Sequence, residues 1–303
     1  MALDPTILLQ PFQYEFFTRA ILVSVLVGGV CGLLGVYIIL RGMSYIGHGM
    51  SHAVFGGAVF SYIAGFNFYI GATIWGFVSA VLINEITRRN KIKADAAIGV
   101  VTTAGFAIGV FLISTTRSYT RNFEALLFGN ILGITDQDLL VIVFVTLTTA
   151  VFIFFFQKRL LFTLFDKETA KVYGVRTDIV ELIFSLILAT VVIASMNSIG
   201  VTLLAAAIVA PAISARMITN NFTKMVIFST IMGVIIAFLG MYSSYFFDSA
   251  SGSTIVLYGA AAFGVCSLYS YLRKIYQTHS HGRLTHSHPH IHVYDHKHDH
   301  LKK

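Results

Sequence analysis

Long apolar segments separated by short polar ones dominate the pattern of this chain. Runs such as residues 141–156 and 179–194 are apolar on every face, whereas barrel strands would alternate apolar and polar positions. Most segments come close to the roughly 20 residues that cross a bilayer as a helix. The segments cover about residues 17–40, 50–66, 69–87, 96–115, 138–156, 180–197, 198–217, 225–247 and 253–272. The pattern predicts an all-α polytopic membrane protein with eight or nine transmembrane helices.

The number of helices is open because one long apolar run, residues 180–217, is interrupted at residues 197–200. This run is either two helices joined by a tight turn at Gly200 or one broken helix. Pro211 lies further along the same run and should kink or break its helix, because proline frees backbone carbonyls. Gly200 and Pro211 are therefore candidate hinges, and a simple packing bend is the equal alternative.

Composition excludes both a soluble enzyme and a disordered chain. Apolar residues make up 56% of the 303 residues, charged residues make up 12%, and the mean hydropathy is +0.78. A soluble domain of this size cannot hide so much apolar surface and still present a charged exterior. Cys31 and Cys266 both lie in apolar runs, and we interpret them as small packing residues. Gly28, Gly32 and Gly35 have the spacing that lets membrane helices approach closely.

The net charge of +7 is explained by topology and does not indicate a nucleic-acid partner. Basic residues gather in the loops at residues 88–93 and 158–176 and after the last apolar run, at residues 273–274. Because cytoplasmic loops are enriched in Lys and Arg, we expect these loops and the C-terminus in the cytoplasm. Nine spans would then place the N-terminus outside, together with Arg117 and Arg121. The N-terminus has no basic region and does not resemble a cleaved signal peptide.

His48 and His52 are the main candidates for chemistry. Four residues apart on a helix, their side chains project from one face about 5–6 Å apart. Two imidazoles at this spacing are able to share a divalent cation, and ionisable groups at membrane depth usually mark a pathway. The alternative is a pair of hydrogen-bonded interfacial histidines. Two ligands do not complete a metal site, so other helices, a symmetry mate or water must contribute.

A histidine-rich tail follows the last apolar run. Its histidines alternate with polar residues, and we expect this tail to be disordered and to bind metal loosely. An inert solvated tail is the alternative. We divide the chain into a transmembrane domain, residues 1–275, and this cytoplasmic tail, residues 276–303. The tail histidines are His279, His281, His286, His288, His290, His292, His296, His298 and His300.

A charged amphipathic stretch, residues 164–176, lies in the long basic loop. It predicts a short helix at the membrane surface that ends near Gly174. This helix is either a plain interfacial element or a docking surface for a cytoplasmic partner. No catalytic residue is predicted, because the chain has no Gly-Lys dipeptide and hence no P-loop, and it has no nucleophile elbow or redox motif. If transport is driven by ATP, another chain must hydrolyse it.

Several motifs, in order over about residues 10–275, resemble the membrane permease of a bacterial ABC importer for zinc, manganese or iron. These motifs are residues 37–44, 52–54, 95–100, 127–133, Phe165 and Asp166 with Ala170 and Gly174, and residues 198–200 leading to 210–212. The resemblance implies the type II importer fold and a homodimer or heterodimer of permeases in the bacterial inner or plasma membrane. It further implies two cytoplasmic ATPase subunits docked near Phe165, Asp166, Glu168, Ala170 and Gly174, and an extracytoplasmic metal-delivery protein. The chain itself would hold no cofactor.

One departure from the family pattern concerns the metal. The resemblance implies an Asp and a His four residues apart near the outer gate; here His52 matches the His, and His48 occupies the Asp position. A dimer would present four imidazoles, which suit zinc better than manganese, since manganese favours oxygen ligands. We therefore expect zinc as the favoured cargo, with manganese or iron as alternatives.

Three rival functions stay open. A permease of the same fold for siderophores or cobalamin would not need the histidine pair. A proton-coupled secondary metal transporter would need further acidic or histidine residues inside several spans. A membrane metal sensor is favoured by the tail alone.

Overall fold

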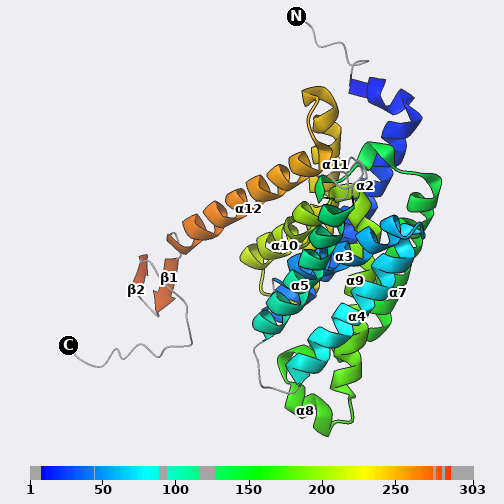
Figure 1. Cartoon of the computed structure of the whole chain (residues 1–303). Coiled ribbons are helices and arrows are strands. Elements are labelled where there is room, and N and C mark those ends of the chain that lie inside the picture. Colours follow the sequence, from blue (N-terminus) through cyan, green and yellow to red (C-terminus); the bar gives the residue numbers. More distant parts are fainter. Residues whose placement is uncertain are drawn as a thin grey trace, which may run out of the picture.

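The computed structural model describes residues 8–43, 45–88, 94–116, 127–275, 278–281 and 284–287. Within these residues nine helices have 18 residues or more, and they pack into an elongated bundle from which the last one projects (Figure 1). They are α2 (Glu15–Leu40), α3 (Ile46–Ile63), α4 (Phe68–Arg88), α5 (Ala94–Thr115), α7 (Asp136–Phe165), α9 (Thr177–Ile199), α10 (Val201–Ile218), α11 (Phe222–Phe247) and α12 (Ser251–Ile275). The short elements are η1 (Gln10–Gln13), η2 (Ile131–Gly133), α8 (Lys167–Val172), β1 (Thr278–His281) and β2 (Leu284–Ser287).

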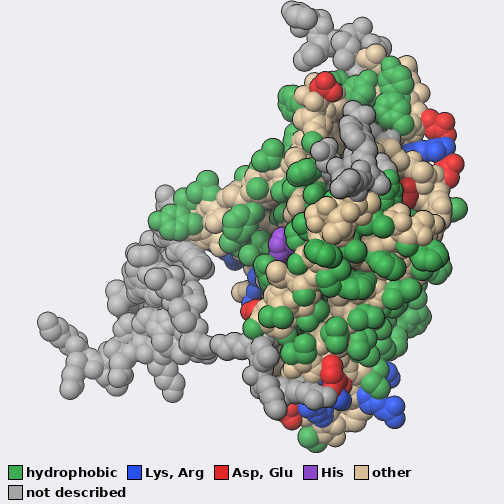
Figure 2. All heavy atoms as spheres, in the orientation of Figure 1, with side chains coloured by type: hydrophobic (Ala, Val, Ile, Leu, Met, Phe, Trp, Pro, Cys, Tyr) green, Lys and Arg blue, Asp and Glu red, His purple; other side chains and the backbone are tan. Residues whose placement is uncertain are grey.

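Eight of the nine long helices are long and apolar enough to cross a membrane, and α3 is the exception. Hydrophobic side chains cover much of the visible flank of the bundle, while charged side chains gather mainly toward its two ends (Figure 2). This distribution suits a lipid-facing flank, because charged groups at bilayer depth are costly. The predicted all-α polytopic fold with eight or nine long helices is confirmed.

The long apolar run at residues 180–217 forms two helices, α9 and α10. Gly200 lies between them with φ +92° and ψ 151°, a conformation that side chains other than glycine rarely adopt. A Cβ on Gly200 would also lie 2.5 Å from the backbone N of Gly129, so the turn is closed against another segment. α10 continues through Pro211 to Ile218, so the proline does not break the helix.

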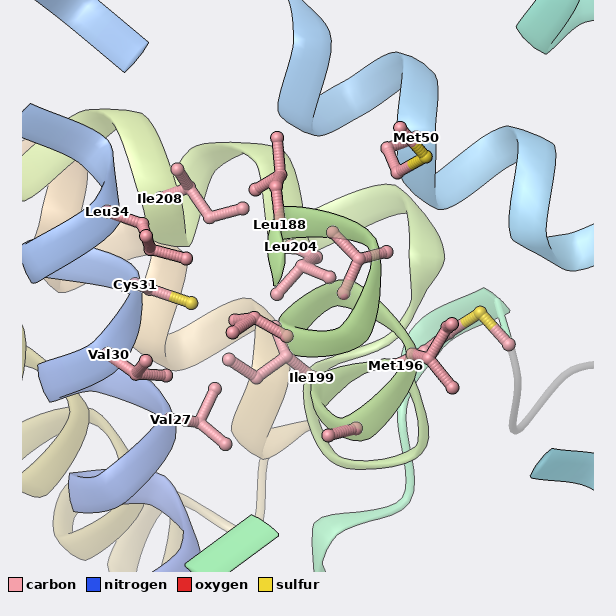
Figure 3. Packing of buried hydrophobic residues seen from close by; sticks show 14 of the residues in the cluster. Val27, Val30, Cys31, Leu34, Met50, Leu188, Met196, Ile199, Leu204 and Ile208 are labelled. Carbon is pink, nitrogen blue, oxygen red and sulfur yellow. The ribbon is translucent and has the colours of Figure 1, made fainter. Parts of the chain in front are cut away.

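The hydrophobic core lies where α2, α3, α9 and α10 meet. Figure 3 shows its centre, with Cys31 and Leu34 from α2, Leu188 from α9 and Ile208 from α10 directed into one apolar cluster. Cys31 and Cys266 are both free and buried, which confirms their prediction as packing residues.

Glycines bring α2 and α11 into backbone contact. A Cβ on Gly28 would lie 2.4 Å from the carbonyl oxygen of Gly233, and one on Gly32 would lie 2.4 Å from that of Ser229. The Ser229 hydroxyl donates a hydrogen bond of 2.6 Å to the Gly32 carbonyl. The predicted close packing of small residues is confirmed, with α11 as the partner of this face.

The C-terminal end of α4 and the short helix α8 lie together at one end of the bundle, opposite η1 (Figure 1). The basic loops that the sequence assigns to the cytoplasm adjoin these two elements, so they share an end as that topology requires. The side of the membrane that this end faces stays a prediction. Arg117 and Arg121, which the topology places outside, lie outside the described residues.

The histidine-rich tail begins with two short antiparallel strands, β1 and β2. Their register places His279 opposite His286 and His281 opposite Leu284. The sequence predicts no regular structure here, and the pairing gives part of the tail an ordered backbone. The remaining histidines, from His288 onward, lie outside the described residues, so a separate disordered tail over residues 276–303 stays a prediction.

Candidate metal site

The helix that carries His48 and His52, α3, lies inside the bundle between α4, α5, α9 and α10. Glycines on its surface admit backbone contacts with its neighbours. A Cβ on Gly56 would lie 2.3 Å from the carbonyl oxygen of Gly105 in α5, and one on Gly57 would lie 2.4 Å from that of Gly71 in α4. This packing fixes the depth and rotation of α3, and hence the direction of both histidines.

His48 and His52 lie side by side one turn apart, as their spacing predicts. Their ring centroids are 4.3 Å apart at an interplanar angle of 69°. Aromatic rings flank the pair, with Tyr45 5.2 Å from His48 and Phe106 4.6 Å from His52 between centroids. Because zinc–nitrogen bonds are about 2.0–2.1 Å long, two imidazoles this close are able to bind one cation after small ring rotations.

Both histidines are half-buried, and histidine side-chain atoms reach the surface in a hollow beside the projecting α12 (Figure 2). Within the described part of the chain, no group of three His, Cys, Asp or Glu side chains gathers where it could hold a metal ion. Among the described residues, the pair is therefore half of a coordination site at most, and it is open to the surface at this hollow.

Ser51, which the sequence analysis did not identify, connects the histidine helix to the turn between α9 and α10. Its buried hydroxyl donates to the carbonyl of His48 at 2.8 Å and to that of Val201 at 3.0 Å. Val201 is the first residue of α10, directly after Gly200. The pair thus lies level with the start of α10, and any movement at Gly200 changes a hydrogen bond of α3.

The α9–α10 turn is also held by the segment before η2. The Asn130 amide donates to the Asn197 carbonyl at 2.9 Å, and the Thr202 hydroxyl donates to the Leu127 carbonyl at 2.8 Å. The Asn197 side-chain amide donates to Asp138 at 3.4 Å, and Asp138 accepts a short hydrogen bond from Tyr69. These residues come from α4, α7 and α9, so this polar cluster joins three helices at the end opposite α8.

No periodic pattern marks the residues of this cluster. The only signal in the sequence is a carboxylate and an amide at the ends of apolar runs, where polar groups need partners.

The predicted surface helix is α8, and its ends follow the prediction. Asp166 caps its first turn by accepting from the Thr169 amide at 2.9 Å, and hydrogen bonds from Thr169 lower the pKa of Asp166. The helix ends at Val172, and Gly174, two residues further on, has φ +79°. Ala170 is fully buried and packs α8 onto the bundle.

The outer surface of α8 and its flanks is apolar. Phe165, Val172 and Tyr173 are 70%, 86% and 76% exposed, while the Glu168 carboxylate faces solvent and contacts Lys171 at 3.3 Å. Large exposed apolar side chains on a short polar helix indicate a surface for another protein. The sequence analysis identified Phe165 and Glu168 for this surface but missed Val172 and Tyr173.

Ion pairs attach α8 to the bundle. The Lys167 ammonium lies 2.7 Å from the Glu181 carboxylate, which also contacts the Arg41 guanidinium at 3.0 Å. Glu181 belongs to α9, and Arg41 follows α2. A force on α8 is therefore transmitted to the segment that joins α2 to the histidine helix.

Membrane-crossing helices surround a less apolar helix that carries paired histidines. This arrangement is that of a transport permease, a class of protein without catalysis of its own. The model of the ABC 3 transport family matches residues 13–270. The chain belongs to this family, as the motifs predict.

Two relatives and one solved structure show how far the similarity extends. The chain is 36% identical over 258 residues to the manganese transport system membrane protein MntC of Listeria monocytogenes, covering 85% of this chain and 92% of that protein. It is 33% identical over 264 residues to a Haemophilus influenzae protein named "Probable iron transport system membrane protein", covering 87% and 93%. PsaBC from Streptococcus pneumoniae in complex with Fab has a TM-score of 0.79 at 33% identity, covering 89% of this chain and 100% of that chain.

Proposed function

We propose that this chain is the permease subunit of an ATP-driven importer that moves a divalent transition metal across the bacterial inner or plasma membrane. The observation that carries the proposal is the His48–His52 pair, with ring centroids 4.3 Å apart and no third ligand among the described residues. A transported ion must bind and leave, and an incomplete, half-exposed pair suits transient binding.

The open side of the pair favours a second permease copy as the source of the missing ligands. In a homodimer, two pairs related by symmetry would offer four imidazoles to one ion in the central pathway. In a heterodimer, the partner permease would supply its own ligands. Both arrangements complete the tetrahedral coordination that zinc prefers.

Zinc is the cargo that we favour on chemical grounds. Neutral imidazole suits zinc better than manganese, which prefers carboxylate oxygens, and the pair holds no carboxylate. The manganese and iron named for the two relatives are the alternatives. Selectivity would then reside partly in His48 and partly in an extracytoplasmic delivery protein.

We further propose that α8 docks onto one of two ATPase subunits. Its exposed apolar residues offer the contact surface, and the Lys167–Glu181–Arg41 ion pairs give a route from α8 to the histidine helix. ATP binding and hydrolysis in the partner would shift α8 and open one gate at a time. Gly200 and Pro211 are the proposed hinges.

The decisive experiment measures uptake of zinc, manganese and iron by cells that express the wild type or His48→Asp, with their own ATPase and delivery protein. We expect the substitution to move the preference from zinc toward manganese by about tenfold, because it restores an oxygen ligand. An unchanged order of preference would refute the role of His48. If every variant, including His52→Ala, kept ATP-dependent metal uptake, the pathway site itself would be refuted.

The tail, residues 276–303, would buffer arriving ions or slow uptake when metal is plentiful. Deleting residues 279–303 should then change the metal concentration at which uptake saturates, without changing which metal is preferred. Identical uptake curves with and without the tail would leave it a solvated appendage.

Two rival functions predict different results in the same cells. A permease for siderophores or cobalamin would take up a metal complex, and His52→Ala would not affect it. A proton-coupled transporter would continue without the ATPase. The described spans disfavour the proton-coupled transporter, since they hold no cluster of three metal-ligating side chains.

A further inference from the structure

A groove runs between α7 and α9 beside the α8 end of the bundle. These helices lie against each other along the flank (Figure 1). The groove encloses about 510 Å³, which is within the usual range for small-ligand sites. Its wall includes Phe152, Phe156 and Arg159 of α7, Tyr173 and Arg176 of the segment between α8 and α9, and Ile183 of α9.

The two ends of the α7–α9 groove differ in chemistry. Phe152 lies 13 residues before the end of α7 at Phe165, about 20 Å along the helix. Together with Phe156 and Ile183, it makes the deep end apolar at a level within the bilayer. Arg159 and Arg176 lie at the shallow end, where lipid headgroups meet the cytoplasm in the predicted topology.

The two arginines of the groove have no carboxylate partner among the described residues. Within the described part of the chain, neither Arg159 nor Arg176 forms an ion pair with a carboxylate. The nearby acids, Asp178 and Glu181, contact Lys167 instead, at 3.6 and 2.7 Å. The Arg159 guanidinium lies 5.7 Å from the centre of the Phe156 ring, which holds it over the groove.

A second hollow of about 500 Å³ adjoins the groove across the Gly174–Ile179 segment. It adds Arg88 and Lys171 to the basic surface, although Lys171 contacts Glu168 and Arg88 contacts Glu85. Its wall includes Thr177, which is 1% exposed and whose hydroxyl has no hydrogen-bond partner within the described structure.

We propose that the α7–α9 groove binds an anionic phospholipid of the cytoplasmic leaflet. The headgroup phosphate lies between Arg159 and Arg176, and an acyl chain lies along Phe152, Phe156 and Ile183. Basic pockets between transmembrane helices at the cytoplasmic side are suited to acidic headgroups. A cytoplasmic protein docked on α8 would contact the groove at Tyr173 and Gly174, and a free phosphate would leave the apolar wall at Phe152 and Phe156 uncovered. The lipid would brace α9 beside α8, at the contact through which the proposed ATPase acts.

The test titrates the purified full-length chain in detergent with dioleoyl-phosphatidylglycerol or dioleoyl-phosphatidylcholine and follows bound lipid by native mass spectrometry. We expect the anionic lipid to bind roughly 30-fold more tightly, since each arginine near the surface contributes about 1 kcal/mol. Arg159→Gln with Arg176→Gln should remove that preference, and it should weaken phosphatidylglycerol binding far more than phosphatidylcholine binding, because the choline cation already neutralises the phosphate of the latter.

Two controls separate this site from general attraction. Arg216→Gln with Lys224→Gln removes two exposed charges outside the groove, at the ends of α10 and α11, and should change the preference less than twofold. Ile183→Trp fills the deep end while both arginines remain, and should weaken phosphatidylglycerol binding at least fivefold.

Three outcomes would overturn the proposal: equal binding of the two lipids, an equal loss in the control pair, or no effect of Ile183→Trp. Soluble glycerol phosphate distinguishes a lipid from a free anion. If glycerol phosphate displaces the lipid only above millimolar concentration, the result supports a lipid site. If it displaces the lipid at lower concentration, the proposal is overturned. None of these outcomes depends on which metal is transported.

Discussion

α3 and α7 are helices of one bundle with opposite surroundings. α3 packs against four other helices, and its buried residues include four glycines, while large side chains such as Phe60 and Tyr62 are exposed only near its C-terminal end. α7 has the highest mean hydropathy of the membrane-crossing helices, and its exposed residues include Phe144, Phe154 and Phe155, each at least 70% exposed. Within this chain, the helix that looks most like a membrane span by composition is among those with the least contact with protein.

The difference teaches that high hydropathy does not mark the candidate pathway, which lies on the one long helix of the described chain that falls short of membrane-span hydropathy. Nor does hydropathy alone report exposure, since α2 and α9 are strongly apolar and mostly buried. Small residues stabilise the packing of one membrane helix on another more than large apolar residues do. They let the backbones come close, and the resulting dispersion contacts are ones that lipid does not replace. The same enclosure allows α3 to carry polar side chains.

The largest expected effect comes from filling a helix contact of α3. Gly56→Leu places side-chain atoms where the Gly105 carbonyl lies, since even a Cβ would be 2.3 Å from that oxygen. We expect a loss of about 3 kcal/mol or more and a fall in Tm of several degrees. The single tryptophan, Trp75, packs against the same helices, so its fluorescence reports the unfolding.

Gly99→Leu is the matched control, because a Cβ on Gly99 in α5 meets nothing within 4 Å. It should leave Tm unchanged or raise it slightly, since leucine favours helix more than glycine does. Equal damage from both substitutions would contradict the close packing of α3.

A smaller effect follows from removing a ring from each helix. Phe55 of α3 is 1% exposed and Phe155 of α7 is 72% exposed. Phe55→Ala should cost about 3 kcal/mol through the cavity it leaves, and Phe155→Ala less than about 0.5 kcal/mol. Thermal unfolding of the two variants in the same detergent measures the contrast, and similar Tm values would mean that the two surroundings are alike.

The smallest effect tests the contact between α3 and the α9–α10 turn. Ser51→Ala removes the hydrogen bond to the Val201 carbonyl and should cost about 1 kcal/mol while also lowering metal uptake. Ser24→Ala removes a bond to Ala20 within α2 alone and should affect stability less and uptake not at all. A drop in uptake with Ser24→Ala equal to that with Ser51→Ala would refute a specific role for this contact.

Much of the fold follows from apolar runs, and the misplaced helix ends have physical reasons. The segment predicted at residues 50–66 begins at Ile46, because histidine and glycine hide the first turn of α3 from a hydropathy pattern. The segment predicted at residues 138–156 extends to Phe165, because Lys158 and Arg159 interrupt the apolar run without ending the helix. Long basic side chains extend toward the membrane surface while their backbone stays helical.

The candidate site was only partly predictable. The spacing of His48 and His52 was sufficient to place both rings on one face, because that depends on local helix geometry alone. The Ser51–Val201 contact joins residues 150 positions apart, and the cluster of Tyr69, Asp138 and Asn197 joins three helices. Single polar residues in apolar runs show that partners are needed, but only the packing of the bundle determines which ones.

The weak hydropathy of α3 has a consequence for how the protein is made. Histidine and glycine lower the tendency of a segment to leave the translocon for lipid on its own. Four helices pack against α3, and all of them emerge from the ribosome after it. α4 and α5 come first, and α9 and α10 follow much later. α3 must therefore wait beside the translocon or pair with α4 as a hairpin, and the helices around the candidate metal site are complete only once α10 has been made.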